Sequence, residues 1–328
     1  MNGKIIVCLL TTVLLSIAPF VDAQQPTKIP RIGYLSVISP STNPARIEAF
    51  RQGLRELGYL EGKSIVIEYR SAEGKLDRLP ALAAELVLLK VDVIITSASG
   101  ETHAAKEATN TIPIVMTNEG DPVGTGFVAS LARPGGNITG LSTFAPELSG
   151  KRLELLKEIV PKLSRLAVVG SSTSPGKAHT LREVELAAGA FGVKLQYLDV
   201  LSPTDIETAF RAAVKGRADA VLMMVAGGVA SSQRTQIVDL AVKGRFPVMY
   251  SERGYVEAGG LMTYGVNLAD LSRRAATYVD KILKGRTPAD LPVEQPMKFE
   301  FIINLKAAKQ IGLTIPPNVL VRADKVIR

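Results

Sequence analysis

An alternation of short apolar segments with helical segments limits the folds open to this chain. Apolar runs of strand length are followed by segments in which apolar residues recur at helical spacing. Such alternation is typical of βαβ units, which place parallel strands in one sheet with helices on its faces. The strands predicted in the first half are 31–35, 64–69, 91–96 and 113–116, and the predicted helices are 49–57, 79–89 and 103–108.

The same order of segments begins again in the second half of the chain. Arg31, in the first predicted strand, lies 134 residues before Arg165, and Pro113 lies 134 residues before Pro247. An ordered series at one offset predicts two similar lobes, so we expect an α/β fold with two doubly wound parallel-sheet lobes. The predicted elements of the second lobe are the strands 165–169, 193–200, 218–225 and 246–250 and the helices 183–191 and 206–214.

Residues 1–23 have the pattern of a secretory signal peptide. Lys4 precedes the apolar stretch 5–19, and a small-x-small site ends at Ala23. We expect cleavage after Ala23 and a periplasmic location; an uncleaved membrane anchor is the alternative. Cys8 is the only cysteine, so the mature chain would hold no disulfide, no cysteine nucleophile and no cysteine metal ligand.

Charge and motif composition argue against several functions. The 39 basic and 31 acidic residues are scattered, without a basic run or interleaved aromatic residues, so we expect no nucleic acid partner. His103 and His179 lack the spacing of a zinc site. The segment 124–129 matches a loose GxGxxA pattern but does not follow a strand directly, and the loop 170–178 departs from the phosphate-loop spacing. We therefore predict no metal and no cofactor; the second loop is an anion-binding turn or a plain turn.

The predicted binding site lies in the loops that follow the strands, because ligands of open parallel sheets bind beyond the carboxyl ends of the strands. Ser97 and Ser99, ahead of a helix, could hold a carboxylate or only cap the helix. Asp121 and Glu252 could each meet an ammonium group or remain solvated, and Tyr264 could pack on an aromatic ligand or in the core. The candidate ligand-binding residues are Ser36, Ser39, Thr96, Ser97, Ser99, Gly100, Asn118, Asp121, Ser171, Ser172, Ala226, Gly227, Glu252 and Tyr264.

Several long segments resemble one protein family. They are GYLSV at 33–37, EAFRQGLRELGY at 48–59, GDPVGTGFVASLARPGGNITGLS at 120–142, VEAGGLMTYGVN at 256–267, DLSRRAATYVDKILKG at 270–285 and FIINLKAAKQIGLTIP at 301–316. Through these segments the chain resembles the solute-binding subunits of bacterial ABC importers, in particular the tryptophan/tyrosine-type subgroup.

This resemblance implies a type I periplasmic-binding-protein fold, in which three hinge crossovers join the two lobes. The crossovers are expected near 142–146, 262–266 and 292–299, with the helix 271–283 returning to the first lobe. The implied division is 24–143 plus 265–292 for lobe 1 and 144–264 plus 293–328 for lobe 2.

The resemblance also implies a function without bond-making chemistry. A monomer would capture a small solute between its lobes and deliver it to an ABC permease in the membrane. An aromatic amino acid is suggested by the subgroup name alone. Two alternatives are a sensor that signals to a membrane receptor and an enzyme on the same fold, for which Glu119 with Asp121 or Glu252 would be the acid/base pair. A transcription regulator is disfavoured, because a signal peptide stands where a DNA-binding domain would be needed.

Overall fold

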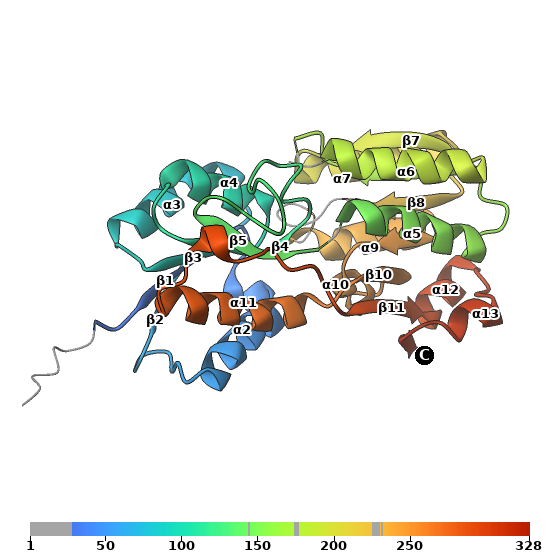
Figure 1. Cartoon of the computed structure of the whole chain (residues 1–328). Coiled ribbons are helices and arrows are strands. Elements are labelled where there is room, and N and C mark those ends of the chain that lie inside the picture. The colour runs from blue at the N-terminus through green and yellow to red at the C-terminus, as the bar shows by residue number, and fades with distance from the viewer. Residues whose placement is uncertain (1–27, 144, 174–176, 225–229, 231) are drawn as a thin grey trace, which may run out of the picture.

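Two α/β lobes lie side by side in the computed structural model (Figure 1). The structure describes residues 28–143, 145–173, 177–224, 230 and 232–328, so the predicted signal peptide lies outside it. Each lobe has a central sheet with helices on both faces, as the alternation of segments predicts.

Lobe 1 has a five-stranded parallel sheet of order β2-β1-β3-β4-β5. Helices α2 and α11 cover one face and helices α3 and α4 cover the other. The bounds are β1 Arg31–Ser36, α2 Pro44–Glu56, β2 Val66–Ser71, α3 Leu79–Leu88, β3 Val93–Thr96, α4 Ser99–Ala108, β4 Ile114–Glu119, β5 Ile138–Ser142 and α11 Leu268–Leu283, with 3-10 turns η1 Pro40–Thr42, η2 Leu76–Arg78 and η3 Pro288–Asp290.

Lobe 2 has a seven-stranded sheet of order β12-β11-β10-β9-β8-β6-β7. Strand β11 pairs antiparallel with β10 and parallel with β12, and the remaining pairs are parallel. The bounds of the strands are β6 Arg165–Gly170, β7 Lys194–Asp199, β8 Ala220–Met223, β9 Val248–Tyr250, β10 Met262–Val266, β11 Phe299–Asn304 and β12 Lys325–Ile327. The bounds of the helices are α5 Ala145–Ile159, α6 Lys177–Phe191, α7 Pro203–Lys215, α9 Arg234–Lys243, α10 Arg253–Glu257, α12 Leu305–Ile311 and α13 Pro317–Leu320.

The internal repeat predicted from the sequence is present in both sheets. Strands β7-β6-β8-β9-β10 of lobe 2 follow the same order as β2-β1-β3-β4-β5 of lobe 1. A matching aspartate fixes the first strand of each lobe: Asp92 accepts a hydrogen bond from the Arg31 amide at 2.8 Å, and Asp219 accepts one from the Arg165 amide at 2.9 Å. The two lobes therefore share this backbone contact as well as their strand order.

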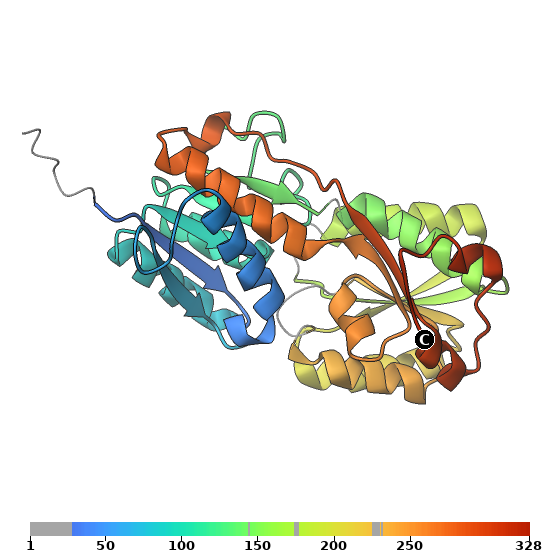
Figure 2. The same cartoon turned by 90° about the horizontal axis from the view of Figure 1, so that it is seen from below.

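The backbone changes lobe at three places in the described part of the chain. Strand β5 of lobe 1 leads to α5 of lobe 2, and β10 of lobe 2 leads to α11, which packs on α2 in lobe 1. Glu294 then forms an isolated bridge with Leu141 of β5 before the chain enters β11 of lobe 2. Figure 2 shows α11, in orange, lying along lobe 1 and the segment after it passing from lobe 1 to lobe 2. No helix of the described residues is long and apolar enough to cross a membrane.

Candidate functional site

A cavity of about 560 Å³ lies between the lobes and is lined by residues of both. Its size falls in the usual range for small-molecule pockets. The loops that follow the strands contribute most of the residues predicted from the sequence, as the rule for parallel sheets requires. The predicted residues that line the cavity are Ser36, Ser39, Ser97, Ser99, Gly100, Asn118, Asp121, Ser171 and Glu252.

Three of the predicted residues do not line the cavity. Thr96 is fully buried in β3, and its hydroxyl pairs with that of Thr102 at 2.8 Å. Ser172 turns away because its amide and hydroxyl both donate to Asp199. Tyr264 packs in the lobe 2 core, where its ring stacks on Phe299. Ala226 and Gly227 lie outside the described residues.

The lobe 1 wall is built at the start of α4, where two serines hold two buried glutamates. Ser97 Oγ donates to Glu101 Oε1 at 2.9 Å, and the Val37 amide donates to the same oxygen at 2.8 Å. Ser99 Oγ donates to Glu119 Oε1 at 2.6 Å. The second oxygen, Oε2, of each glutamate has no hydrogen-bond partner among the described residues. The serine hydroxyls predicted to hold a ligand carboxylate are thus directed to carboxyl groups of the protein itself.

Burial changes the protonation of both glutamates. Removal from water raises the pKa of Glu119 to about 7, and it also raises the pKa of Glu101. The charge of Glu101 repels that of Glu119, which raises the pKa of Glu119 further. An anionic ligand bound against this wall would meet the same repulsion, so the start of α4 is a poor place for a ligand carboxylate.

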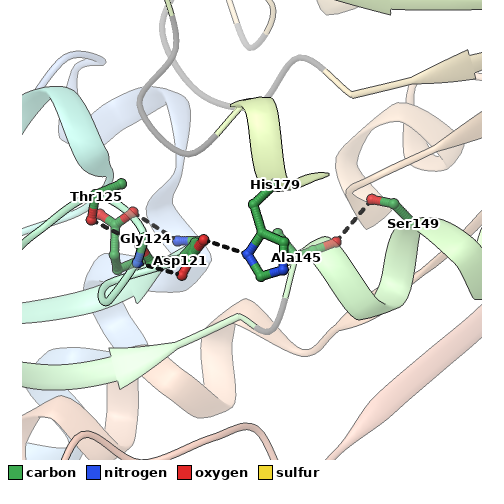
Figure 3. Close-up of polar contacts among 8 residues, drawn as sticks. Asp121, Gly124, Thr125, Ala145, Ser149 and His179 are labelled. Carbon is green, nitrogen blue, oxygen red and sulfur yellow. Dashed lines mark hydrogen bonds and ion pairs between the residues drawn. The ribbon is translucent and has the colours of Figure 1, made fainter. Parts of the chain in front are cut away.

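Among the residues that the structure describes, two ion pairs join the lobes across the cavity. Arg46, in the first turn of α2, meets Glu252, at the start of α10, with 2.7 Å between Nη2 and Oε2. Asp121, after β4, meets His179, in the first turn of α6, with 2.7 Å between Oδ2 and Nδ1 (Figure 3). The two carboxylates expected to meet a ligand ammonium therefore already have arginine or histidine partners on the opposite lobe.

The Asp121 residue is held in place by its own loop. Its Oδ1 accepts a hydrogen bond from the Gly124 amide at 2.8 Å, and its backbone carbonyl accepts from the Thr125 hydroxyl at 2.7 Å (Figure 3). This turn occupies the segment that resembles a GxGxxA motif. It uses Gly124 to orient an aspartate, because a Cβ on Gly124 would lie 2.1 Å from Asp121 Oδ2.

Arg152 lines the cavity although it is not among the residues predicted from the sequence. It lies on α5 of lobe 2 and is 6% exposed, and its Nε donates to the Tyr264 carbonyl at 2.7 Å. Nothing in its local sequence distinguishes it from a solvent-exposed helical arginine. Arg253, by contrast, follows strand β9 closely, yet it pairs with Glu257 at 2.7 Å and does not line the cavity.

Apolar groups form the larger part of the cavity surface. Among the described residues that line the cavity, Tyr34 is the one tyrosine. The chain contains no Trp, so no indole ring contributes to this surface. The aliphatic lining comes from both lobes and includes Val37, Ile38, Ile47, Leu76, Leu79, Val200, Leu201, Met224, Val266 and Leu268. Charged groups at a few points and an apolar surface between them suit a small solute with polar ends and an apolar body. No group of residues in the described ranges has the composition of a metal site.

A family model for ABC transporter substrate binding proteins matches residues 31–327. The chain belongs to this family. The match spans both lobes and all the crossovers between them, so the family assignment covers nearly the whole of the described fold.

Three similar proteins place the chain within the family. A tyrosine-binding protein of Clostridioides difficile is 27% identical over 274 residues, which cover 84% of this chain and 78% of that protein. A conserved domain protein of Vibrio cholerae has a TM-score of 0.86 at 30% identity, covering 91% of this chain and 100% of that chain. A Streptococcus pneumoniae ABC domain in complex with L-Trp has a TM-score of 0.84 at 26% identity, covering 91% and 99%. The likeness to these structures agrees with a type I periplasmic-binding-protein fold.

Proposed function

We propose that this protein is the exported solute-binding component of an ABC importer and that it captures an amino acid with an aromatic side chain between its lobes. The observation that carries the proposal is the interlobe cavity, which combines charged groups from both lobes with an extensive apolar surface. Membership of a family of substrate-binding proteins supports binding rather than catalysis.

The choice of solute class is supported by the relatives and by the cavity. One relative is named for tyrosine, and the structure of another is of a complex with L-Trp. A cavity of about 560 Å³ with mostly aliphatic walls offers space for an aromatic ring, which gains free energy in proportion to the apolar area that it buries.

Closure of the lobes would be the event that the importer recognises. In this proposal the hinge separates 24–143 plus 265–292 from 144–264 plus 293–328, and the solute favours the closed arrangement by binding both lobes at once. The pairs Arg46–Glu252 and Asp121–His179 add contacts that exist only when the lobes meet. The closed monomer would then dock on a membrane permease, with residues 1–23 as the cleaved signal peptide for export to the periplasm.

The test is isothermal titration of the purified protein, unfolded and refolded to remove copurified solute, with L-tyrosine and L-tryptophan. We expect a dissociation constant in the micromolar range or tighter for at least one of them, and no heat with L-alanine or glucose. Binding of glucose but of neither aromatic amino acid would contradict the proposed solute class. Consumption of the bound amino acid would instead favour an enzyme.

A further inference from the structure

Arg152 carries a buried positive charge whose partners are neutral groups. Its Nε donates to the Tyr264 carbonyl at 2.7 Å, and its Nη2 donates to the Ser251 carbonyl at 3.4 Å. Among the described residues, no carboxylate lies within 4.0 Å of the guanidinium nitrogens. Burial lowers the pKa of Arg152 to about 10. Buried charges in proteins are normally paired, so an anion bound beside this guanidinium would stabilise it.

Glu252 does not fully balance the charge of Arg152. Glu252 acts on Arg152 electrostatically, but its carboxylate forms its ion pair with Arg46 of lobe 1 at 2.7 Å. The other cation on the lobe 2 wall, Lys177, lies over the Tyr197 ring at 4.1 Å and is more exposed. Within the described part of lobe 2, Arg152 is therefore the buried cation that faces the cavity without an anionic partner of its own.

A second unused donor stands beside Arg152. The Ser251 hydroxyl is buried and has no hydrogen-bond partner among the described residues, while the carbonyl of the same residue accepts from Arg152. Both residues line the cavity. A guanidinium fork next to a free hydroxyl is a suitable set of donors for the two oxygens of a carboxylate.

We infer that Arg152, assisted by the Ser251 hydroxyl, binds the carboxylate of the solute, and that the solute enters the site with its acidic end toward lobe 2. This inference rests on the proposed function in taking the interlobe cavity as the solute site. It reverses the orientation expected from the sequence, which placed the carboxylate at Ser97 and Ser99. The lobe 1 wall has the complementary character, because the unpartnered Glu101 Oε2 there can accept from an ammonium or hydroxyl group.

The test compares each acid with its neutral amide on the full mature protein. The first pair is L-tyrosine with L-tyrosinamide. The second pair is acetate with acetamide, which tests carboxylate binding even if the site does not accept an aromatic side chain. The variants are Arg152→Gln and Arg152→Lys, with Arg211→Gln, an exposed arginine of α7 paired with Glu207, as the matched control. Affinity is measured by titration for the tyrosine pair, and the shift of the unfolding temperature is measured for the acetate pair.

We expect the wild type and Arg211→Gln to bind the acid about 10- to 100-fold more tightly than the amide, as for hydrogen bonds to a charged group. Arg152→Gln should bind acid and amide equally, and Arg152→Lys should keep part of the preference because it keeps the charge but loses the fork. The inference is overturned if Arg152→Gln still prefers the acids, or if acetate and acetamide act alike on the wild type. The wild type could fail to bind tyrosine and still prefer acetate to acetamide in a manner that depends on Arg152. That result would refute only the proposed solute class.

Discussion

At the scale of single residues, the wall of lobe 1 depends on carboxyl groups removed from water. Glu119 is 1% exposed, and only one of its two oxygens receives hydrogen bonds from the described residues, from the Ser99 hydroxyl and the Gly120 amide. The neutral acid can satisfy this environment more easily than the anion, because a protonated oxygen needs less solvation. Folding therefore favours the protonated form of Glu119.

This preference predicts a pH dependence of stability. The pKa of Glu119 rises from its ordinary value of 4.5 to about 7 in the fold. Its contribution to the free energy of unfolding is largest below pH 4.5. This contribution falls as the pH rises from 4.5 to about 7, because the unfolded chain releases the proton first. Glu119→Gln should remove this contribution, so the stability difference between variant and wild type should change by about 3 kcal/mol across the window.

The measurement is urea unfolding of both proteins at a series of pH values. Gln keeps an oxygen for the Ser99 hydroxyl, so the variant should still fold. Glu185→Gln, at an exposed position of α6, is the control and should follow the wild-type curve. Parallel curves for Glu119→Gln and the wild type would show that Glu119 ionises normally in the fold.

Several site residues that were predicted from the sequence lie at strand ends, whereas two that were missed lie on helices. Ser97, Asn118 and Asp121 lie at or just beyond the ends of strands, so the rule for parallel sheets was enough to find them. Arg46 and Arg152 project from helices, where an arginine usually lies in solvent. Arg46 pairs with Glu252 of the opposite lobe, and Arg152 donates to carbonyls of Ser251 and Tyr264 within its own lobe, and no local sequence pattern records either contact.

At the scale of elements, the contact between α2 and α11 joins the second crossover to lobe 1. Gly53 lies at this contact, where a Cβ would come within 2.3 Å of the Arg273 carbonyl oxygen and 2.9 Å of Ala276 Cβ. The absence of a side chain therefore allows the two helices to approach closely. Apolar residues of both helices, including Phe50 and Leu271, then share one core cluster.

We expect Gly53→Ala to destabilise the fold by about 1–3 kcal/mol, because the added methyl group must push α11 away from α2. The midpoint of thermal or urea unfolding measures the effect. Gly189→Ala in α6 is the matched control, since a Cβ at Gly189 would meet nothing outside its own helix within 4 Å. It should leave stability unchanged or raise it by up to about 1 kcal/mol, owing to the better helix propensity of Ala. Equal effects of the two substitutions would exclude the steric argument.

The order of elements was largely predictable from the sequence, but the strands β5, β10, β11 and β12 were not predicted, and β5 shows the physical reason. Both lobes were found because their fully buried strands are continuous apolar runs, such as β3 and β8, separated by amphipathic helices. Strand β5 contains Gly140 and follows a Pro-Gly-Gly segment, which indicates a loop when only local residues are considered. Gly140 is required by β4 instead: its φ is 133°, and a Cβ would lie 2.1 Å from the Met116 carbonyl oxygen.

At the scale of the whole molecule, one of the ion pairs across the cavity, Asp121–His179, contains a histidine, the side chain whose charge ordinarily changes near physiological pH. The hydrogen bond from His179 to Asp121 raises the pKa of His179, and the charges of Asp121, Glu147 and Glu183 act in the same direction. Contact between the lobes thus favours the protonated imidazole.

The sign of the resulting pH dependence follows from the raised pKa. The contribution of the Asp121–His179 pair to closure is fully present below the ordinary histidine pKa of 6.5 and is lost as the pH rises through the raised value. We expect the ligand-free protein to be more compact at about pH 5 than at about pH 8.5. Small-angle X-ray scattering, through the radius of gyration, measures the change.

Two variants separate this effect from general electrostatics. His179→Gln removes the titrating partner of Asp121 and should remove most of the change in the radius of gyration over this pH range. Arg46→Gln removes the other interlobe pair, so it should favour the open form at every pH while leaving the response to pH in place. A pH response that persists in His179→Gln would mean that other charges control closure. If the response disappears only in that variant, the Asp121–His179 pair links proton binding to the closed state, and any solute that requires closure must bind more tightly in acid by the same linkage.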